Sequence, residues 1–300
     1  MFIIMIRTES KVSILCRKLD SDSCRENQFY RNMDNEQNKV VNLDLSNCLT
    51  KSRVTSQSRA NLLQWKIRVL TAIEESLDYE KLFKSIEITD HYLKNTGRTQ
   101  GDQDLYLIGI TSLFISFKYN NNYHLKIKNF IRRISPGRFK PTEITAKEFE
   151  IMKAVGFNIS KRGLSFLLNY FLCDLFEVGS NAFIKIKTIS HNFLLLMLLD
   201  AGVYDCSPNE LILAVLCTAI GFYYDSKLKN GKVDFGYKKL ETVYRHENAI
   251  LKKIHSYSKD SKELKRIYQK IKNFIQFIQS KYKDYQDIIK LIQMSGDGFK

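Results

Sequence analysis

The first residue whose position suggests chemistry is Lys118, a single cation at the end of a helical stretch that is apolar on nearly every side. A lysine ammonium can form charge-assisted hydrogen bonds with the carbonyl or carboxylate oxygens of a partner. It can equally be a solvated helix end that the helix dipole favours. Lys118 alone leaves both interpretations open, and the rest of the chain has to decide between them.

Residues for catalysis or metal binding form no known pattern in this sequence. The chain has no glycine-rich phosphate loop, no nucleophile elbow and no HExxH sequence. Its five histidines are scattered among neighbours typical of a helix surface, and its six cysteines include no CxxC pair. We therefore expect no catalytic residue, no metal and no cofactor, and we expect that the chain is not an enzyme.

The composition favours an intracellular helical protein. A chain of 300 residues with 44% hydrophobic content can build one large domain or two ordinary ones, and three prolines leave room for long helices. Without a secretory signal or an apolar run of ~20 residues, we expect it in the nucleus, the cytoplasm or both, with no membrane partner. The net charge of +15 would suit an acidic partner, but we attribute it to a composition rich in Lys, Asn, Ile and Tyr.

The stretch that ends at Lys118 is expected to be the buried central helix of a five-helix unit. Small side chains at Gly109 and Ser112 stand among the bulky apolar ones, so that other helices can cross it closely. Four further helices are predicted: one at 58–77, one that begins after the capping residue Asp78, one at 127–134, and one that begins at Thr142.

A similar arrangement is predicted after a connector at 156–163. Helices at 164–176, 183–199 and 208–224 are followed by long amphipathic helices at 237–255 and 263–289, and the third is again apolar all round with small residues spaced through it. The predicted fold class is all-α, with two tandem five-helix repeats, each around a buried third helix. We divide the chain into a disordered N-terminal tail (1–52), a first repeat (53–160), a second repeat (161–285) and a C-terminal tail (286–300).

Several separated stretches together resemble the cyclin family. The first repeat is similar to a first cyclin box in SRANLLQW (58–65), ITDHYL (88–93), LYLIGITSLFISFKY (105–119) and EITAKEFEIMKAVGFNIS (143–160). The second resembles a second cyclin box more weakly, in LSFLLNYF (164–171), LLLMLLD (194–200) and CSPNELILAVLCTAI (206–220). The chain is identified as a divergent two-box cyclin.

The resemblance implies a buried ion pair between Arg59 and Asp90 inside the first box. A guanidinium can bond both oxygens of a carboxylate, which suits a charge that has left water. The role of this pair would be structural.

The resemblance also implies a kinase-binding surface formed by Lys118, Glu148, Ile115, Tyr119, Met152 and Phe157. In the family, the lysine and the glutamate hold the C-helix of a cyclin-dependent kinase and the loop before it. The apolar residues would form the bed for that helix. The implied function is that of a kinase regulatory subunit in cell-cycle control, with kinase substrates as further partners.

The sequence departs from the family in places that bear on partner choice. Asn120 and Asn121 stand where many relatives have two acids, and Ser58 and Asn61 occupy positions of an apolar substrate-docking patch. Of that patch only Leu62 and Trp65 remain, so we do not expect Arg-x-Leu substrates to dock there.

Two other functions keep the same fold. Transcription initiation factor B proteins carry two cyclin-like repeats that grip DNA, but they also carry a zinc ribbon with paired cysteines, and Cys16, Cys24 and Cys48 are isolated here. We therefore do not expect nucleic acid as the partner. A cyclin-fold scaffold that binds a kinase without activating it is the other alternative.

Overall fold

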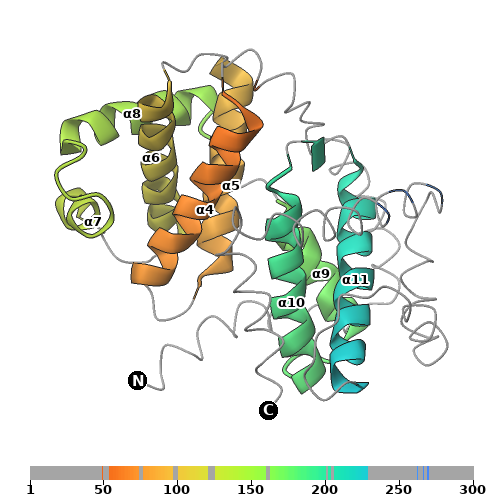
Figure 1. The fold of residues 1–300 in the computed structure, drawn as a ribbon. Helices are drawn as coiled ribbons and strands as arrows, with labels where there is room; N and C mark the ends of the chain where they lie inside the picture. The colour runs from red at the N-terminus through yellow and green to blue at the C-terminus, as the bar shows by residue number, and fades with distance from the viewer. Residues whose placement is uncertain are drawn as a thin grey trace.

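The computed structural model describes residues 49, 54–73, 77–96, 101–120, 126–159, 163–200, 202–203, 206–228, 262, 266 and 269. All regular secondary structure among these residues is helical, as predicted, and the eight described helices form two groups (Figure 1). In the described part, no helix is long and apolar enough to cross a membrane, and no group of His, Cys, Asp or Glu side chains could hold a metal ion.

The first group contains five helices, with α6 at its centre. Its members are α4 (Ser56–Ile73), α5 (Tyr79–Thr96), α6 (Asp102–Asn120), α7 (Ile127–Ile134) and α8 (Pro141–Ala154). α6 packs against each of the other four, and its residues from Ile108 to Phe117 are all buried. Asp78 caps α5, because the amide nitrogen of Lys81 donates to its carboxylate at 3.1 Å.

Gly109 permits the close crossing of α4 and α6. A Cβ atom at this position would lie 2.5 Å from Cδ1 of Leu62, which is closer than carbon atoms approach one another. The small residue that the sequence places in the central helix is therefore required by contact with its neighbour.

The second group contains α9 (Leu164–Leu175), α10 (Asn181–Met197) and α11 (Pro208–Leu228). α11 packs against both α9 and α10, and its residues from Leu211 to Gly221 are buried. The third helix of the second group is therefore buried, as expected. Several predicted segments lie outside the described residues: the helix at 237–255, the helix at 263–289 except residues 266 and 269, the C-terminal tail, and residues 1–48 and 50–52 of the N-terminal tail. Leu49 is described, and it is buried in the core of the first group.

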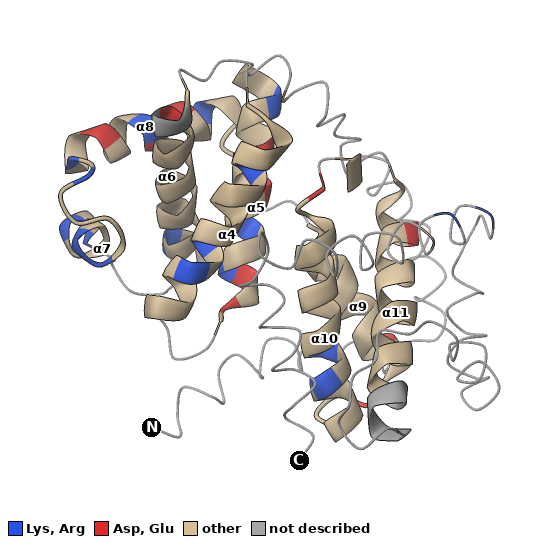
Figure 2. Ribbon diagram, in the orientation of Figure 1, with Lys and Arg blue, Asp and Glu red and all other residues tan. Residues whose placement is uncertain are grey.

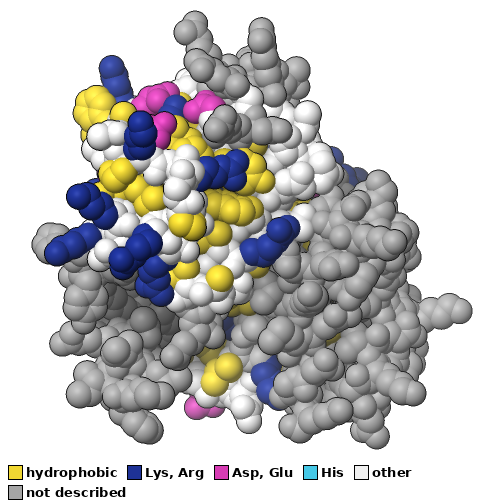
Figure 3. Space-filling view, turned by 60° about the vertical axis from the view of Figure 1, so that its left-hand side comes forward, with side chains coloured by type: hydrophobic (Ala, Val, Ile, Leu, Met, Phe, Trp, Pro, Cys, Tyr) yellow, Lys and Arg dark blue, Asp and Glu magenta, His cyan; other side chains and the backbone are white. Residues whose placement is uncertain are grey.

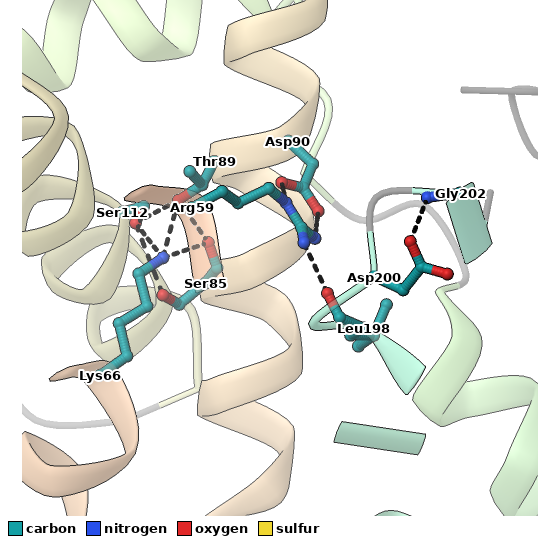
Figure 4. Close-up of polar contacts among 9 residues, drawn as sticks. All are labelled: Arg59, Lys66, Ser85, Thr89, Asp90, Ser112, Leu198, Asp200 and Gly202. Carbon is teal, nitrogen blue, oxygen red and sulfur yellow. Dashed lines mark hydrogen bonds and ion pairs between the residues drawn. The ribbon is translucent and has the colours of Figure 1, made fainter. Parts of the chain in front are cut away.

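Arg59 and Asp90 form a fully buried pair between α4 and α5 (Figure 4). Arg59 Nε donates to Asp90 Oδ1 at 2.8 Å and Nη2 donates to Oδ2 at 2.7 Å, so the guanidinium bonds both carboxylate oxygens. Its third nitrogen, Nη1, donates to the carbonyl oxygen of Leu198 at 2.5 Å. Leu198 follows α10, so this arginine connects the two groups of helices.

A second contact between the groups involves α5 and α10. The hydroxyl of Tyr79 donates to Oδ1 of Asn192 at 2.6 Å, and the rings of Tyr79 and Phe83 lie 4.9 and 5.6 Å from the imidazole of His191. We expected the histidines on helix surfaces, and for His191 that expectation is wrong, because its side chain is 1% exposed. Burial lowers its pKa to about 4, so the imidazole is neutral at pH 7.

Lys66 of α4 is fully buried among hydroxyl groups, which the apolar pattern of this helix does not indicate. Its ammonium donates to the carbonyl oxygen of Ser85 at 3.0 Å, to Thr89 Oγ1 at 2.7 Å and to Ser112 Oγ at 2.9 Å (Figure 4). Burial lowers the pKa of Lys66 to about 7. The core of the first group thus contains a lysine close to losing its charge at neutral pH.

Candidate partner-binding surface

Lys118 and Glu148 lie together on the surface of the first group. Lys118 is in the last turn of α6 and Glu148 is in the middle of α8, and the distance from Nζ to Oε1 is 2.6 Å. The side chain of Lys118 is 49% exposed and that of Glu148 is 19% exposed. The ammonium also lies 5.2 Å from the centre of the Phe114 ring. The pair therefore presents one donor and one acceptor at a solvent-accessible junction of two helices.

Three exposed aromatic side chains lie on the same two helices and the turn that follows them. Tyr119 is 47% exposed, Phe149 is 65% exposed and Phe157 is 61% exposed. The rings of Phe149 and Phe157 meet edge to face, with their centres 6.3 Å apart. Large exposed aromatic side chains are typical of a protein interface.

Phe157 stands on a left-handed turn that ends α8. Its φ is 56° and that of Gly156 is 66°, and the amide nitrogen of Phe157 donates to the carbonyl oxygen of Met152 at 2.8 Å. A left-handed conformation is unfavourable for a residue other than glycine, by roughly 1–3 kcal/mol. The turn directs the large ring of Phe157 to the surface, where burial does not offset this strain.

The structure distributes the six residues of the predicted surface unevenly. Lys118, Glu148, Tyr119 and Phe157 are accessible to a partner, and Met152 is partly buried beside them. Ile115 is 3% exposed and belongs to the core, so the expectation that it lines the surface is wrong. Phe149 of α8 is not among the six predicted residues, but it also lies on the surface.

A network around Lys147 fixes α8 against α5 and α6, and the sequence did not indicate it. Lys147 Nζ lies 3.1 Å from Asp104 and 2.7 Å from Glu150, and the hydroxyl of Tyr92 donates to Glu150. Although burial lowers the pKa of Lys147, the two carboxylates raise it above its ordinary value. Burial raises the pKa of Tyr92 to about 12. The network holds the residue next to Glu148 in place.

The two residues left from the substrate-docking patch do not form an exposed apolar surface. Leu62 is 1% exposed and packs against α6, and Trp65 is partly buried with its ring 5.6 Å from that of Tyr106. Both side chains serve the packing of α4.

The fold has a counterpart among solved structures. A viral cyclin from herpesvirus saimiri superposes with a TM-score of 0.50 and 16% sequence identity, over 73% of this chain and 87% of that one. Together with the buried arginine–aspartate pair and the tandem helical groups, this likeness defines the class as a protein with the cyclin fold. Residues 28–160 match the family model of the cyclin N-terminal domain, so this part of the chain is a divergent cyclin domain.

Curated relatives of the chain include mitotic cyclins. The G2/mitotic-specific cyclin-B of Marthasterias glacialis is 27% identical over 169 residues, which are 56% of this chain and 41% of the relative. The G2/mitotic-specific cyclin-A of Patella vulgata is 26% identical over 167 residues, which are 55% of this chain and 37% of the relative. The chain thus matches about two fifths of the length of these relatives. The family match begins at residue 28, before the domain boundary that we predicted at 53.

Proposed function

We propose that this cyclin binds a cyclin-dependent serine/threonine kinase through the surface around Lys118 and Glu148, and that it activates the kinase in cell-cycle control. The observation that carries the proposal is the 2.6 Å pair at the junction of α6 and α8, together with the exposed rings of Tyr119, Phe149 and Phe157 on these helices and the turn after α8. The mitotic relatives support the cell-cycle role.

The pair can exchange its internal bond for bonds to a partner. An ion pair as exposed as this one contributes about 0–1 kcal/mol to stability, because water screens it. A charged group that bonds a partner's backbone contributes roughly 1.5–3 kcal/mol. Lys118 can donate to carbonyl oxygens at the end of a partner helix, and Glu148 can accept from amide groups of the loop before it. Opening the internal ion pair for these bonds lowers the stability of the cyclin only a little.

The exposed rings would supply the apolar part of the contact. Phe149, Phe157 and Tyr119 are rigid and lose little conformational entropy when a partner covers them. A kinase helix seated on them is turned inward until its glutamate meets the catalytic lysine, which phosphoryl transfer requires. The cyclin itself performs no chemistry in this proposal and acts in the nucleus, the cytoplasm or both.

Affinity capture from cells tests the proposal. The full chain, the variant Lys118→Ala/Glu148→Ala and the control variant Glu177→Ala/Lys185→Ala, which removes the same charges from the second group, are compared at low and high salt. We expect the full chain and the control to retain a protein kinase through the high-salt wash and to stimulate its activity on a peptide, and the first variant to lose at least tenfold of both.

Other outcomes separate the alternatives. Kinase retained equally by all three proteins contradicts the proposed surface. Kinase retained without stimulation supports a scaffold that does not activate. Recovery of nucleic acid alone, lost at high salt, supports a function like that of transcription initiation factor B.

A further inference from the structure

A basic surface around α7 has no part in the proposed kinase contact. Between Asp104 and Glu143 the sequence contains seven Lys or Arg and no Asp or Glu, and one of the seven, Lys118, is paired with Glu148. The other six are exposed and are named here the α7 basic surface: Lys126, Lys128, Arg132, Arg133, Arg138 and Lys140. α7 carries only basic charge in Figure 2, and Figure 3 shows Lys and Arg side chains spread over this side of the molecule with acids gathered near one edge.

The folding of α7 presents these cations outward. Phe130, Ile131 and Ile134 are buried against the neighbouring helices, so the opposite face of α7 is in solvent. Lys128 and Arg132 are four residues apart and therefore neighbours on that face. Like charges at this spacing destabilise a helix, and an anionic partner would relieve that repulsion.

Two arginines of the surface are held in place by the fold. Arg133 Nη2 donates to the carbonyl oxygen of Ile73 at 3.2 Å. The guanidinium of Arg138 lies 4.5 Å from the ring centre of Tyr106 and 5.6 Å from that of Phe139. Stacking uses the face of a guanidinium and leaves the N–H groups in its plane for carboxylate or phosphate oxygens. Side chains fixed in advance lose less entropy on binding.

The charge of the surface is not neutralised within the described part of the chain. None of the described carboxylates forms an ion pair with any of its six cations, whereas Lys118 and Lys147, on the neighbouring helices, both have carboxylate partners. The surface is therefore complementary to an acidic partner.

We propose that the α7 basic surface binds a short acidic segment of another protein, whose Asp, Glu or phosphorylated side chains accept hydrogen bonds from it. An eight-residue helix is ~12 Å long, which matches about four residues of an extended peptide. Double-stranded DNA is commonly held by 6–10 phosphate contacts along a longer surface. Single strands need free aromatic faces for base stacking, and Arg138 covers those of Tyr106 and Phe139.

Fluorescence anisotropy with defined probes tests this proposal on the full chain. The probes are a labelled decapeptide of Glu and Asp, a decapeptide with two phosphoserines, a neutral Gln decapeptide, and a 20-base-pair duplex DNA. The test variant is Lys128→Glu/Arg132→Glu, and the control, Lys153→Glu/Lys185→Glu, changes the net charge by the same amount elsewhere. Circular dichroism and thermal melting verify folding, and Lys128→Gln/Arg132→Gln replaces the test variant should the charge reversal unfold the chain.

We expect at least one of the two acidic peptides to bind at least tenfold more tightly than the neutral one, and its affinity to fall at least tenfold in the test variant but less than twofold in the control. A preference for phosphoserine over Glu and Asp identifies a phosphorylated segment. Any of three results would overturn the proposal: equal losses of affinity in both variants, no preference for the acidic peptides over the neutral one, or tighter binding of DNA than of the acidic peptides at the same salt concentration. Kinase capture by the test variant stays at the level of the unchanged chain, which distinguishes this surface from that of Lys118 and Glu148.

Discussion

Arg59 donates to the carbonyl oxygen of Leu198 with the one guanidinium nitrogen that does not bond Asp90. The cation that stabilises the first group of helices therefore also holds the second group against it. Each of the three guanidinium nitrogens of this fully buried side chain donates a hydrogen bond, so the loss of the side chain affects both groups.

Substitution of either member of the buried pair is expected to destabilise the whole chain. Arg59→Ala leaves the carboxylate of Asp90 buried without its partner, and Asp90→Ala does the same to the guanidinium, so each lowers the free energy of unfolding by about 3–5 kcal/mol. Urea denaturation of both single variants and the double variant measures this. A double variant as unstable as the sum of the single ones would mean that the two residues do not interact.

The buried ammonium of Lys66 should make stability rise with pH. Its pKa is lowered by burial to about 7 in the folded chain and is about 10.5 in the unfolded one, so between these values the unfolded state binds more protons. The free energy of unfolding then increases by ~2 kcal/mol from pH 7 to pH 9. Lys66→Met should be more stable at pH 7 and should lack this increase. The same pH slope in the variant would show that Lys66 is not its source.

His191 should give a second pH dependence, below neutrality. Burial lowers its pKa to about 4, against 6.5 in the unfolded chain, although a hydrogen bond with the backbone carbonyl oxygen of Lys187 at 2.7 Å favours the charged form. The unfolded state gains a proton first as the pH falls, so stability present above pH 6.5 is lost progressively toward pH 4, by ~2 kcal/mol between pH 7 and pH 5. The comparison is with His191→Gln, whose unfolding free energy should change less over the same interval. Parallel curves for the two proteins would contradict this assignment.

Phe157 should separate stability from binding. Phe157→Gly removes the strain of a left-handed φ of 56°, so the melting temperature should stay the same or rise. Truncation of a phenylalanine in the core would instead destabilise the protein. The same change should weaken retention of the captured kinase at least tenfold, because an exposed anchor is lost. Thermal melting and quantitative capture give the two readouts. Loss of stability together with unchanged capture would assign Phe157 to the fold alone.

Gly109 should tolerate no side chain unless α4 gives way. In Gly109→Ala the new methyl group meets Leu62 at 2.5 Å, and overpacking of this kind is expected to lower the free energy of unfolding by about 1–3 kcal/mol. The double variant Gly109→Ala/Leu62→Ala restores the space. Its loss of unfolding free energy should therefore be smaller than the sum of the losses in the two single variants. Strict additivity of the two effects would rule out this contact as the cause.

The sequence predicted the positions of the helices better than their orientation. α7 and the start of α9 lie where the apolar pattern places them. The start of α10 was placed two residues late, at Phe183, because the apolar pattern begins there, whereas the hydroxyl of Ser180 accepts from the amide nitrogen of Phe183 and caps a helix that starts at Asn181.

The candidate surface shows the same limit. α6 is apolar on all sides, so its pattern could not tell that Ile115 faces the core while Lys118 emerges from it. Lys66 and His191 are polar residues whose partners lie on other helices, and only the tertiary contacts bury them. The same holds for the network around Lys147, whose members come from α5, α6 and α8.

The contact of Tyr79 and Phe83 with His191 sets a condition for work with shorter fragments. A polypeptide that stops after the first five helices would expose both rings to water. It would also lack the carbonyl oxygen of Leu198, to which Nη1 of Arg59 donates. Such a fragment has an exposed apolar surface and is expected to self-associate, and self-association would resemble partner binding in a pull-down. Measurements of affinity therefore call for a polypeptide that keeps both halves.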